Sequence, residues 1–280
     1  MSAHAQVIPP GPVDLTALPT DRTAGVKDSK KKGKKALVDL GPELSDLQER
    51  LFARGRRGSS RRLLLVLQGM DTSGKGGILR HTVGLVDPQG VRITSFKAPT
   101  EEERAHDFLW RIRRALPGPG IIGVFDRSHY EDVLVPRVHA TVEPEEIERR
   151  YDVINEFEQG LVDSGTIVLK CLLHISPAEQ KKRLLARLDQ PTKHWKYNPH
   201  DVDERARWAD YRQAYEIAIE RTNTEAAPWR LVPSDHKWYR NLAIGELLLA
   251  TLGDLDLDWP VADFDVDAER ARLTGEEPIA

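Results

Sequence analysis

The sequence GMDTSGKGG, residues 69–77, follows the apolar run RLLLVLQ at 62–68. It matches the pattern G-x4-G-K, in which backbone amides and a lysine cradle phosphate groups. A Ser or Thr normally follows the lysine, because its hydroxyl holds a magnesium ion, but here Gly76 follows Lys75. The stretch is therefore either an ordinary glycine-rich turn or a phosphate loop whose metal is held by other residues.

The position of the stretch favours a phosphate loop. The run before it has the continuous apolar character of a buried parallel strand, and the residues after it are expected to form a helix. Gly69 and Gly74 permit a tight turn with amides directed at phosphate oxygens, and Lys75 would contact the phosphates as a point charge.

The composition is that of a globular protein. The chain has 280 residues, 40% hydrophobic and 30% charged, with a formal net charge of −3. This balance gives no reason to expect a nucleic-acid partner, so an anion site must be built locally from the 41 Lys and Arg residues. Cys171 is the only cysteine, which excludes an intramolecular disulfide and a Cys-rich zinc cluster.

The targeting features point to the cytoplasm. The start, MSAHAQVIPPGPVD, lacks the basic and apolar segments of a secretory signal. No apolar run approaches the ~20 residues of a membrane helix. We therefore expect a soluble cytoplasmic protein without a membrane partner.

Strand and helix patterns alternate along the chain. Strands are expected at 62–68, 91–96, 121–125, 166–175 and 229–232. Helices are expected at about 42–52, 75–86, 100–117, 144–162, 177–188, 201–221 and 236–252. Thr100 and Glu103 resemble a capping box. This order indicates one α/β domain with a doubly wound parallel sheet flanked by helices.

The domain is expected to span residues 43–260, including a lid at about 177–200. Residues 1–42 are rich in Pro, Gly and charge, with KDSKKKGKK at 27–35. We expect this basic segment to be flexible, because it has little apolar surface to bury. Residues 261–280 form an acidic C-terminal tail.

A second group of polar residues follows the apolar strand IIGVF at 121–125. Asp126 ends the strand at the edge where a metal-holding acid belongs in a nucleotide-binding sheet, and Arg127 follows it. Asp71 is a second carboxylate within the loop. Two carboxylates are enough for magnesium, which keeps several waters and binds phosphates, and they would replace the missing hydroxyl.

A third group of polar residues is cationic. Arg183 and Arg187 are four residues apart on a predicted helix, and like charges there are destabilising unless an anion lies between them. This favours a lid over phosphates, while the alternative is a solvated basic helix paired with Glu179 and Asp189. Lys97 lies at the tip of the second strand, on the ligand-binding edge.

These stretches together resemble the polyphosphate kinase 2 family. The resemblance covers about residues 40–260 and is carried by LQGMDTSGKGG, DPQGVRITSFKAPTEEE, VFDRSHYEDVLVPRV, HISPAEQKKRLLARLDQPTKHWK, ERARWADYRQAYEIAIERTNTEAAPW and VPSDHKWYRN. It implies a P-loop kinase fold of the thymidylate-kinase kind with a helical lid. It also implies magnesium-dependent phosphoryl transfer between inorganic polyphosphate and nucleotides, with Mn²⁺ as a substitute metal.

The resemblance also implies the site residues. The catalytic set is Lys75, Asp71, Asp126, Arg127, Arg183 and Arg187, with Asp71 and Asp126 as the metal ligands. Nucleotide and phosphate binding is assigned to Gly69, Gly74, Lys75, Gly76, Lys97 and Arg127. Polyphosphate binding is assigned to Lys181, Lys182, Arg137, Lys193 and Lys196.

The resemblance leaves the acceptor open. The stretches SFKAPTEEE, SHYEDVLV and HKWYRN resemble the group that accepts AMP as well as ADP, whereas Asp126 is usual in the group that interconverts diphosphates and triphosphates. We expect reversible conversion of ADP to ATP and also of AMP to ADP, with guanine nucleotides as further candidates. A homo-oligomer, dimer or tetramer, is expected, and no specific nucleic acid.

Two other functions are considered. One is an ATP-dependent kinase of nucleotides or small molecules on the same fold. The other is a non-catalytic polyanion-binding protein that uses residues 27–35 and the basic lid.

Overall fold

A six-stranded sheet forms the centre of the molecule. The computed structural model describes residues 5–23 and 29–275. The strand order is β1-β6-β5-β2-β4-β3; β1 is antiparallel to β6, and the other neighbours are parallel. The strands are β1 (Gln6–Val7), β2 (Arg62–Gln68), β3 (Val91–Ser95), β4 (Ile122–Asp126), β5 (Thr166–His174) and β6 (Trp229–Pro233).

Strand β2 lies at the centre and is buried on both faces. Leu64 and Val66 join the hydrophobic cluster on one face of the sheet, and Leu63, Leu65 and Leu67 join the cluster on the other. Side chains of a strand alternate between the faces, so a strand covered on both sides has a continuous apolar sequence.

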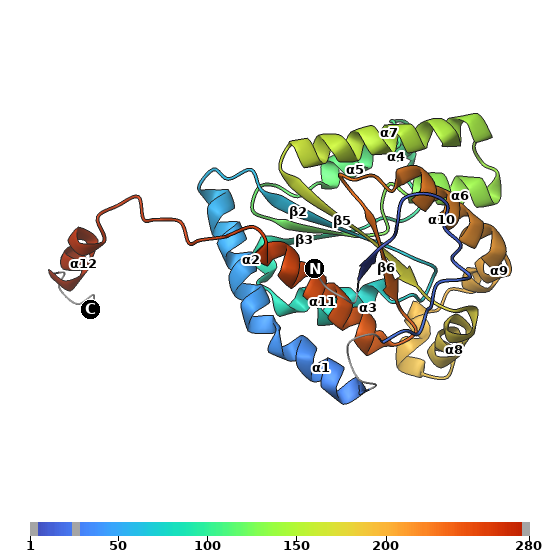
Figure 1. The fold of residues 1–280 in the computed structure, drawn as a ribbon, viewed down its shortest axis with the longest axis horizontal. Helices are drawn as coiled ribbons and strands as arrows, with labels where there is room; N and C mark the ends of the chain where they lie inside the picture. The colour runs from blue at the N-terminus through green and yellow to red at the C-terminus, as the bar shows by residue number, and fades with distance from the viewer. Residues whose placement is uncertain (1–4, 24–28, 276–280) are drawn as a thin grey trace.

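Helices cover both faces of the sheet (Figure 1). On one side lie α4 (Glu101–Arg104), α5 (Trp110–Ala115), α6 (Glu131–His139), α7 (Pro144–Asp163) and α10 (Trp208–Thr222). On the other lie α1 (Lys30–Asp39), α2 (Gly41–Arg56), α3 (Lys75–His81) and α11 (Lys237–Gly253). The remaining helices are η1 (Val83–Leu85), η2 (Pro88–Gly90), α8 (Pro177–Leu188), η3 (Pro191–Lys196), α9 (His200–Ala206) and α12 (Val266–Gly275).

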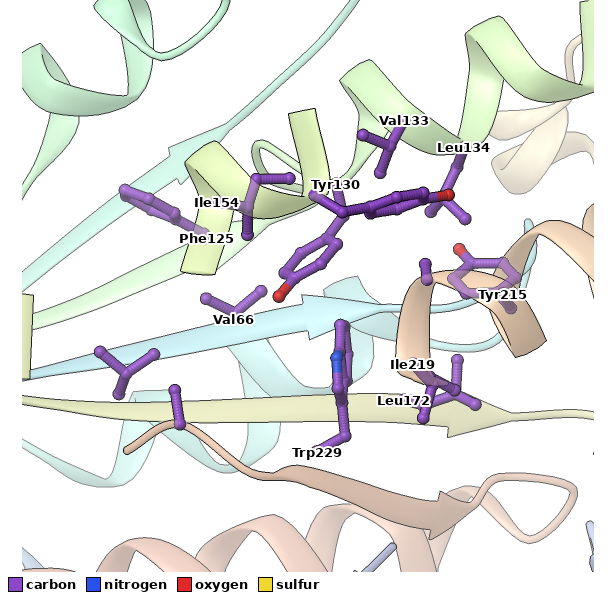
Figure 2. Packing of buried hydrophobic residues seen from close by; sticks show 14 of the residues in the cluster. Val66, Phe125, Tyr130, Val133, Leu134, Ile154, Leu172, Tyr215, Ile219 and Trp229 are labelled. Carbon is purple, nitrogen blue, oxygen red and sulfur yellow. The ribbon is translucent and has the colours of Figure 1, made fainter. Parts of the chain in front are cut away.

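Large buried aromatic residues join the central strands to the helices above them. Figure 2 shows Tyr130 and Trp229 in the same buried cluster, where their rings meet edge to face with centroids 4.7 Å apart. Tyr215 of α10 packs into the same cluster. The segment that follows β4 is therefore held against β6 and α10.

The five predicted strands are present, each within one residue of its expected bounds, and they form the predicted parallel sheet. The capping box at Thr100 is also present. The helix expected over 100–117 is divided into α4 and α5, and that over 201–221 into α9 and α10. The helix after the loop ends at His81 rather than near Val86 and gives way to η1.

The N-terminal segment differs from the flexible tail that we expected. Gln6–Val7 extends the sheet, and Ile8 and Leu15 are each 4% exposed in the core. Helix α1 packs on α11. The few apolar residues of this segment pack on a surface that the rest of the chain supplies. The composition of the segment alone does not indicate that such a surface exists. Residues 1–4 and 24–28 lie outside the described part of the chain.

The C-terminal end extends away from the sheet and carries α12 (Figure 1). Residues 261–275 are exposed apart from Glu269. Among the residues that the structure describes, no helix is long and apolar enough to cross a membrane.

Candidate active site at the phosphate loop

The loop between β2 and α3 has a backbone that depends on glycine. Gly69 and Gly74 have φ values of 148° and 113°, and Thr72 also has a positive φ, of 64°. A Cβ atom at Gly74 would lie 1.6 Å from Nη1 of Arg240, so no larger residue fits there without a shift of that buried side chain. The loop is therefore compact and held close to its neighbours.

Two buried arginines hold the carbonyl groups of this loop. Arg183 Nη1 donates to the carbonyl oxygens of Thr72 and Ser73, at 2.8 and 3.1 Å. Arg240 Nη1 donates to the same carbonyl of Ser73 at 2.8 Å. Arg183 and Arg240 are only 7% and 2% exposed. With its carbonyls engaged in this way, the loop has a fixed shape.

Arg183 was expected to face phosphate from the lid, beside Arg187. Its guanidinium lies instead among the carbonyls of the loop and of Ser234 and Asp235, and its Nε donates to Glu179 at 2.9 Å. Arg187 donates to Asp201 at 3.2 Å. Each arginine thus has oxygen partners of its own, and no bridging anion is needed to account for their spacing.

The predicted lysine and the predicted arginine meet at the loop. Lys75 begins α3, and its Nζ donates to the carbonyl of Gly69 at 2.7 Å. Arg127 follows β4 in a left-handed conformation, with φ of 65°, and its Nη2 donates to Asp71 Oδ1 at 3.0 Å. Glu131, in the first turn of α6, lies 3.9 Å from Arg127 Nε. Sequence reasoning missed Glu131.

Strand register places Asp126 beside the same loop. Asp126 pairs with Leu67 of β2, two residues before Gly69. Arg127 N donates to the carbonyl of Leu67 at 3.1 Å. The carboxyl ends of β2 and β4 therefore bring together the residues that the two sequence motifs predicted.

The electrostatics of this cluster are coupled. Burial opposes ionisation of Asp71, but Lys75 and Arg127 outweigh it and lower the pKa of this carboxyl. Burial lowers the pKa of Lys75, with Arg127 acting in the same direction against Asp71 and Asp126. Burial raises the pKa of Glu131 despite the nearby cations. Burial thus opposes the charged forms of Lys75 and Glu131, and the opposite charges around them offset only part of this cost.

The donor set fits magnesium. Asp71 and Asp126 offer hard carboxylate oxygens, and the negative charge of each favours the charged forms of Lys75 and Arg127. Within the described residues, no three His, Cys, Asp or Glu side chains form a metal cage. Mg²⁺ needs no such cage, because it binds through one or two carboxylates, waters and substrate phosphates.

A pocket of about 550 Å³ opens in front of the loop. Its lining includes Gly69, Met70, Asp71, Lys97, Arg111, Arg127, Glu131, Asp201, Glu204, Trp208, Tyr211 and Tyr215. Lys97, which was predicted at the ligand-binding edge, contributes to this lining. Trp208, Tyr211 and Tyr215 of α10 lie at positions i, i+3 and i+7, a spacing that is typical of a helix face packed in the core. Tyr215 is buried, but all three side chains also contribute to the pocket wall. Spacing alone cannot distinguish a core face from a face that lines a pocket.

The segment predicted as a lid, at about 177–200, forms α8 and η3, and α9 follows directly after it. Figure 1 shows α8 and α9 beyond the end of β6. Glu204 of α9 accepts from Tyr211 and lies 3.1 Å from His139 and 3.0 Å from His200. The contacts with His139 and Tyr211 join α9 to α6 and α10, and all four of these side chains line the pocket. Histidines 139 and 200 thus contribute to the lid contacts.

The residues assigned to polyphosphate are not gathered in this pocket. Lys181, Lys182 and Lys196 are exposed on the lid, and Lys193 is half-buried there. Arg137 is paired with Glu148 on α7. Gly76 is exposed, and within the described residues no atom lies within 4 Å of where its Cβ would be. Close packing therefore does not account for the glycine at position 76.

Comparisons with known proteins agree with this geometry. The model of the family described as polyphosphate kinase 2 matches residues 27–258. The chain is 43% identical over 255 residues to an AMP/ADP-polyphosphate phosphotransferase of Meiothermus ruber, covering 91% of this chain and 94% of the relative. It is 40% identical over 260 residues to an ADP-polyphosphate phosphotransferase of Rhodopseudomonas palustris, covering 89% of this chain and 88% of the relative.

The structure is also similar to a solved one. The crystal structure of polyphosphate kinase 2 from Arthrobacter aurescens superposes with a TM-score of 0.93 at 53% identity, over 96% of this chain and 95% of that one. The predicted P-loop kinase fold is confirmed by this likeness. The chain belongs to the polyphosphate kinase 2 family.

Proposed function

We propose that this chain transfers a phosphoryl group reversibly between inorganic polyphosphate and nucleotides, converting ADP to ATP and AMP to ADP. The observation that carries the proposal is the cluster of Lys75, Asp71 and Arg127 at a phosphate loop, with Asp126 beside it. The relatives named for AMP/ADP and ADP phosphotransfer support both acceptors.

The chemistry requires screening of negative charge. Two phosphate chains repel each other as they approach, since each phosphate carries about one charge. Lys75 and Arg127 would neutralise the transferring group, and the loop amides would orient it. Phosphoryl transfer depends mainly on positioning and charge stabilisation, so no covalent intermediate on the protein is required.

Asp71 and Asp126 would hold Mg²⁺, or Mn²⁺ in its place. When bound, such an ion supplies positive charge to the oxygens of adjacent phosphates. The aromatic wall of Trp208 and Tyr211 offers flat surfaces for a nucleotide base. Base preference, a cytoplasmic location and a homo-oligomeric state remain predictions.

An acceptor panel tests the proposal. The protein is incubated with Mg²⁺ and long-chain polyphosphate as the only phosphoryl donor, together with AMP, ADP, GMP or GDP in turn. We expect ATP from ADP and ADP from AMP, and we expect an excess of EDTA to stop both. No nucleotide product from polyphosphate, combined with turnover when ATP is the donor, would favour an ATP-dependent kinase instead.

A further inference from the structure

The last residue of β2 carries a buried amide at the start of the phosphate loop. Gln68 is fully buried, and it lies on the same face of the sheet as Leu64 and Val66, because strand side chains alternate between the faces. A polar side chain in such a place is costly unless its atoms are hydrogen-bonded. The cost of burying Gln68 therefore depends on its partners.

The oxygen of this amide connects to the phosphate loop through Tyr215 of α10. The Tyr215 hydroxyl donates to Gln68 Oε1 at 3.3 Å and accepts from the backbone amide of Gly69 at 3.1 Å. Burial and the nearby Glu131 raise the pKa of Tyr215 well above its ordinary value, so the hydroxyl keeps the proton that it donates. The first amide of the loop is thereby linked to the side chain of the residue before it.

The nitrogen of the amide connects to the segment that follows β4. Gln68 Nε2 donates to Ser128 Oγ at 3.1 Å, and this Oγ also accepts from the backbone amide of Tyr130 at 3.2 Å. Ser128 is fully buried, and it directly follows Arg127. The amide of Gln68 thus joins the end of β2 to the residue next to Arg127.

Glu131 is a second group at the nitrogen end of the amide. Its side chain lines the pocket in front of the loop and lies 3.9 Å from Arg127 Nε. Burial raises the pKa of Glu131, whereas Arg127, Lys75 and a side-chain hydrogen bond with Gln68 act against this rise. The hydrogen bond from Gln68 therefore favours the charged form of the carboxylate beside Arg127.

The two ends of the amide serve partners of opposite kind. The Tyr215 hydroxyl needs an acceptor for its proton, and the Glu131 carboxylate needs a donor. Glutamine supplies both from one planar group. Ionised glutamate only accepts, and it would place a second negative charge against Glu131. Glutamate therefore matches Gln68 in shape but not in hydrogen bonding.

We propose that Gln68 is a positioning residue for phosphoryl transfer: its amide fixes the phosphate loop relative to the segment that carries Arg127 and Glu131. The inference rests on the proposed function. Lys75 follows the loop and Arg127 follows β4, so a shift between the two segments would separate the cations that neutralise the transferring group. A shift of about 1 Å in the position of a reacting group can lower the rate about a hundredfold.

The test exchanges donor and acceptor between Gln68 and Glu131. Gln68→Glu removes the donor, and Glu131→Gln removes the carboxylate. The double variant Q68E/E131Q restores one amide and one carboxylate with their positions exchanged. For each protein, initial rates of ATP formation give kcat and the KM values for ADP and for polyphosphate, and urea unfolding gives the stability.

Gln48→Glu is the matched control. Gln48 of α2 is also buried, at 1% exposure, and its Oε1 accepts from the backbone amide of Asp87 at 3.1 Å, in the turn before β3. The control places the same new carboxylate in a buried position, but not in the link between the phosphate loop and the segment after β4. It therefore separates the effect of burying a charge from the effect of losing this link.

We expect Q68E to lower kcat at least about tenfold and to change both KM values by less than about threefold, because the substrates bind but the cations are misplaced. Q68E/E131Q should be at least about threefold faster than Q68E, since residues in contact couple and the exchanged pair again has one donor and one acceptor. Q48E should keep the kcat of the unmodified protein, whatever its stability. Tyr215→Phe, which removes only the hydroxyl, should also lower kcat.

An unchanged kcat in Q68E would overturn the proposal, and so would a double variant that is no faster than Q68E or an equal fall of kcat in Q48E. If Q68E does not fold, Tyr215→Phe decides, and an unchanged kcat in that variant contradicts the link to the loop. A failure of the proposed function looks different. The unmodified protein would then form no ATP from polyphosphate, while urea unfolding would still report whether Glu131→Gln offsets the loss of stability in Q68E.

Discussion

At the scale of single residues, Arg240 is unusual because it is a cation buried beside the phosphate loop. Its guanidinium is 2% exposed, and burial together with nearby Arg183 lowers its pKa to about 9. Its hydrogen bonds go to the carbonyl of Ser73 and to the side-chain oxygen of Asn241. A buried cation is costly unless it is well hydrogen-bonded. The burial of Arg240 therefore depends on the position of the Ser73 carbonyl in the phosphate loop, and Arg240 in turn holds that carbonyl in place.

We predict that Arg240→Gln and Arg183→Gln weaken both the fold and turnover. Each change removes one charged donor from a loop carbonyl, which costs about 1–3 kcal/mol in the free energy of unfolding. A displaced loop should lower kcat at least about tenfold, since a shift of about 1 Å in the position of a reacting group can lower the rate about a hundredfold. Urea unfolding and the initial rate of ATP formation measure the two effects. A loss of stability with kcat unchanged would mean that neither arginine positions the loop.

The role of Arg183 also marks a limit of sequence reasoning. Its spacing from Arg187 predicted a shared helix face and an anion between the two side chains. The observed partners include the carbonyl of Ser234, 51 residues away, and that of Thr72, 111 residues away. Such partners depend on tertiary packing, which no local pattern encodes. Lys75, Asp71 and Arg127, in contrast, lie in local motifs at strand ends, and the sequence alone indicated that they meet.

At the scale of elements, the segment between β4 and α6 is anchored by a buried ionic network. Glu158 of α7 accepts from Lys170 Nζ of β5 at 2.6 Å and from the Tyr130 hydroxyl at 2.9 Å. Glu158 also lies 3.1 Å from His129 Nε2. Glu158, Lys170 and His129 are fully buried. This network fixes the residues that directly follow Arg127.

We predict that Lys170→Met destabilises the fold by about 3–5 kcal/mol, because it leaves a buried carboxylate without its cation. Lys170→Met/Glu158→Leu should recover much of that loss, since no unpaired charge remains. Urea unfolding compares the three proteins. Equal losses in the single and the double variant would show that the ion pair itself, rather than the unpaired charge, accounts for the effect.

The same network predicts how stability depends on acid. Burial opposes ionisation of Glu158, but Lys170 and His129 outweigh it, so its pKa lies below the ordinary 4.5. A lowered carboxyl pKa contributes stability that is fully present above 4.5 and is lost as pH falls through the folded-state pKa. Unfolding free energy should thus fall more steeply below pH 4.5 in the unmodified protein than in K170M/E158L. Parallel pH profiles would contradict this.

One residue in the sequence of β5 indicates this network, although the strand pattern alone does not. Lys170 interrupts the apolar run TIVLKCLLH of β5, where a charge needs a buried partner. The elements themselves were largely predictable, because β2, β4 and β5 are continuous apolar runs between amphipathic helices. Strand β1 was not, since two residues show no periodicity and their pairing with β6 joins positions more than 200 residues apart.

At the scale of the whole molecule, the N-terminal segment completes the fold. Residues 5–23 add β1 and bury Leu15. Helix α1 packs on α11, on the side of the sheet that α2 and α3 also cover.

We propose that phosphoryl transfer takes place at the phosphate loop through Lys75 and Asp126. The most direct measurement is the rate of ATP formation from ADP and Mg²⁺, with polyphosphate as the only donor, by Lys75→Ala and Asp126→Ala beside the control Lys31→Ala. We predict a loss of at least about a hundredfold in the first two, because each removes charge stabilisation of the transferring group, and no change in the control. Near-normal turnover in K75A or D126A would contradict the account.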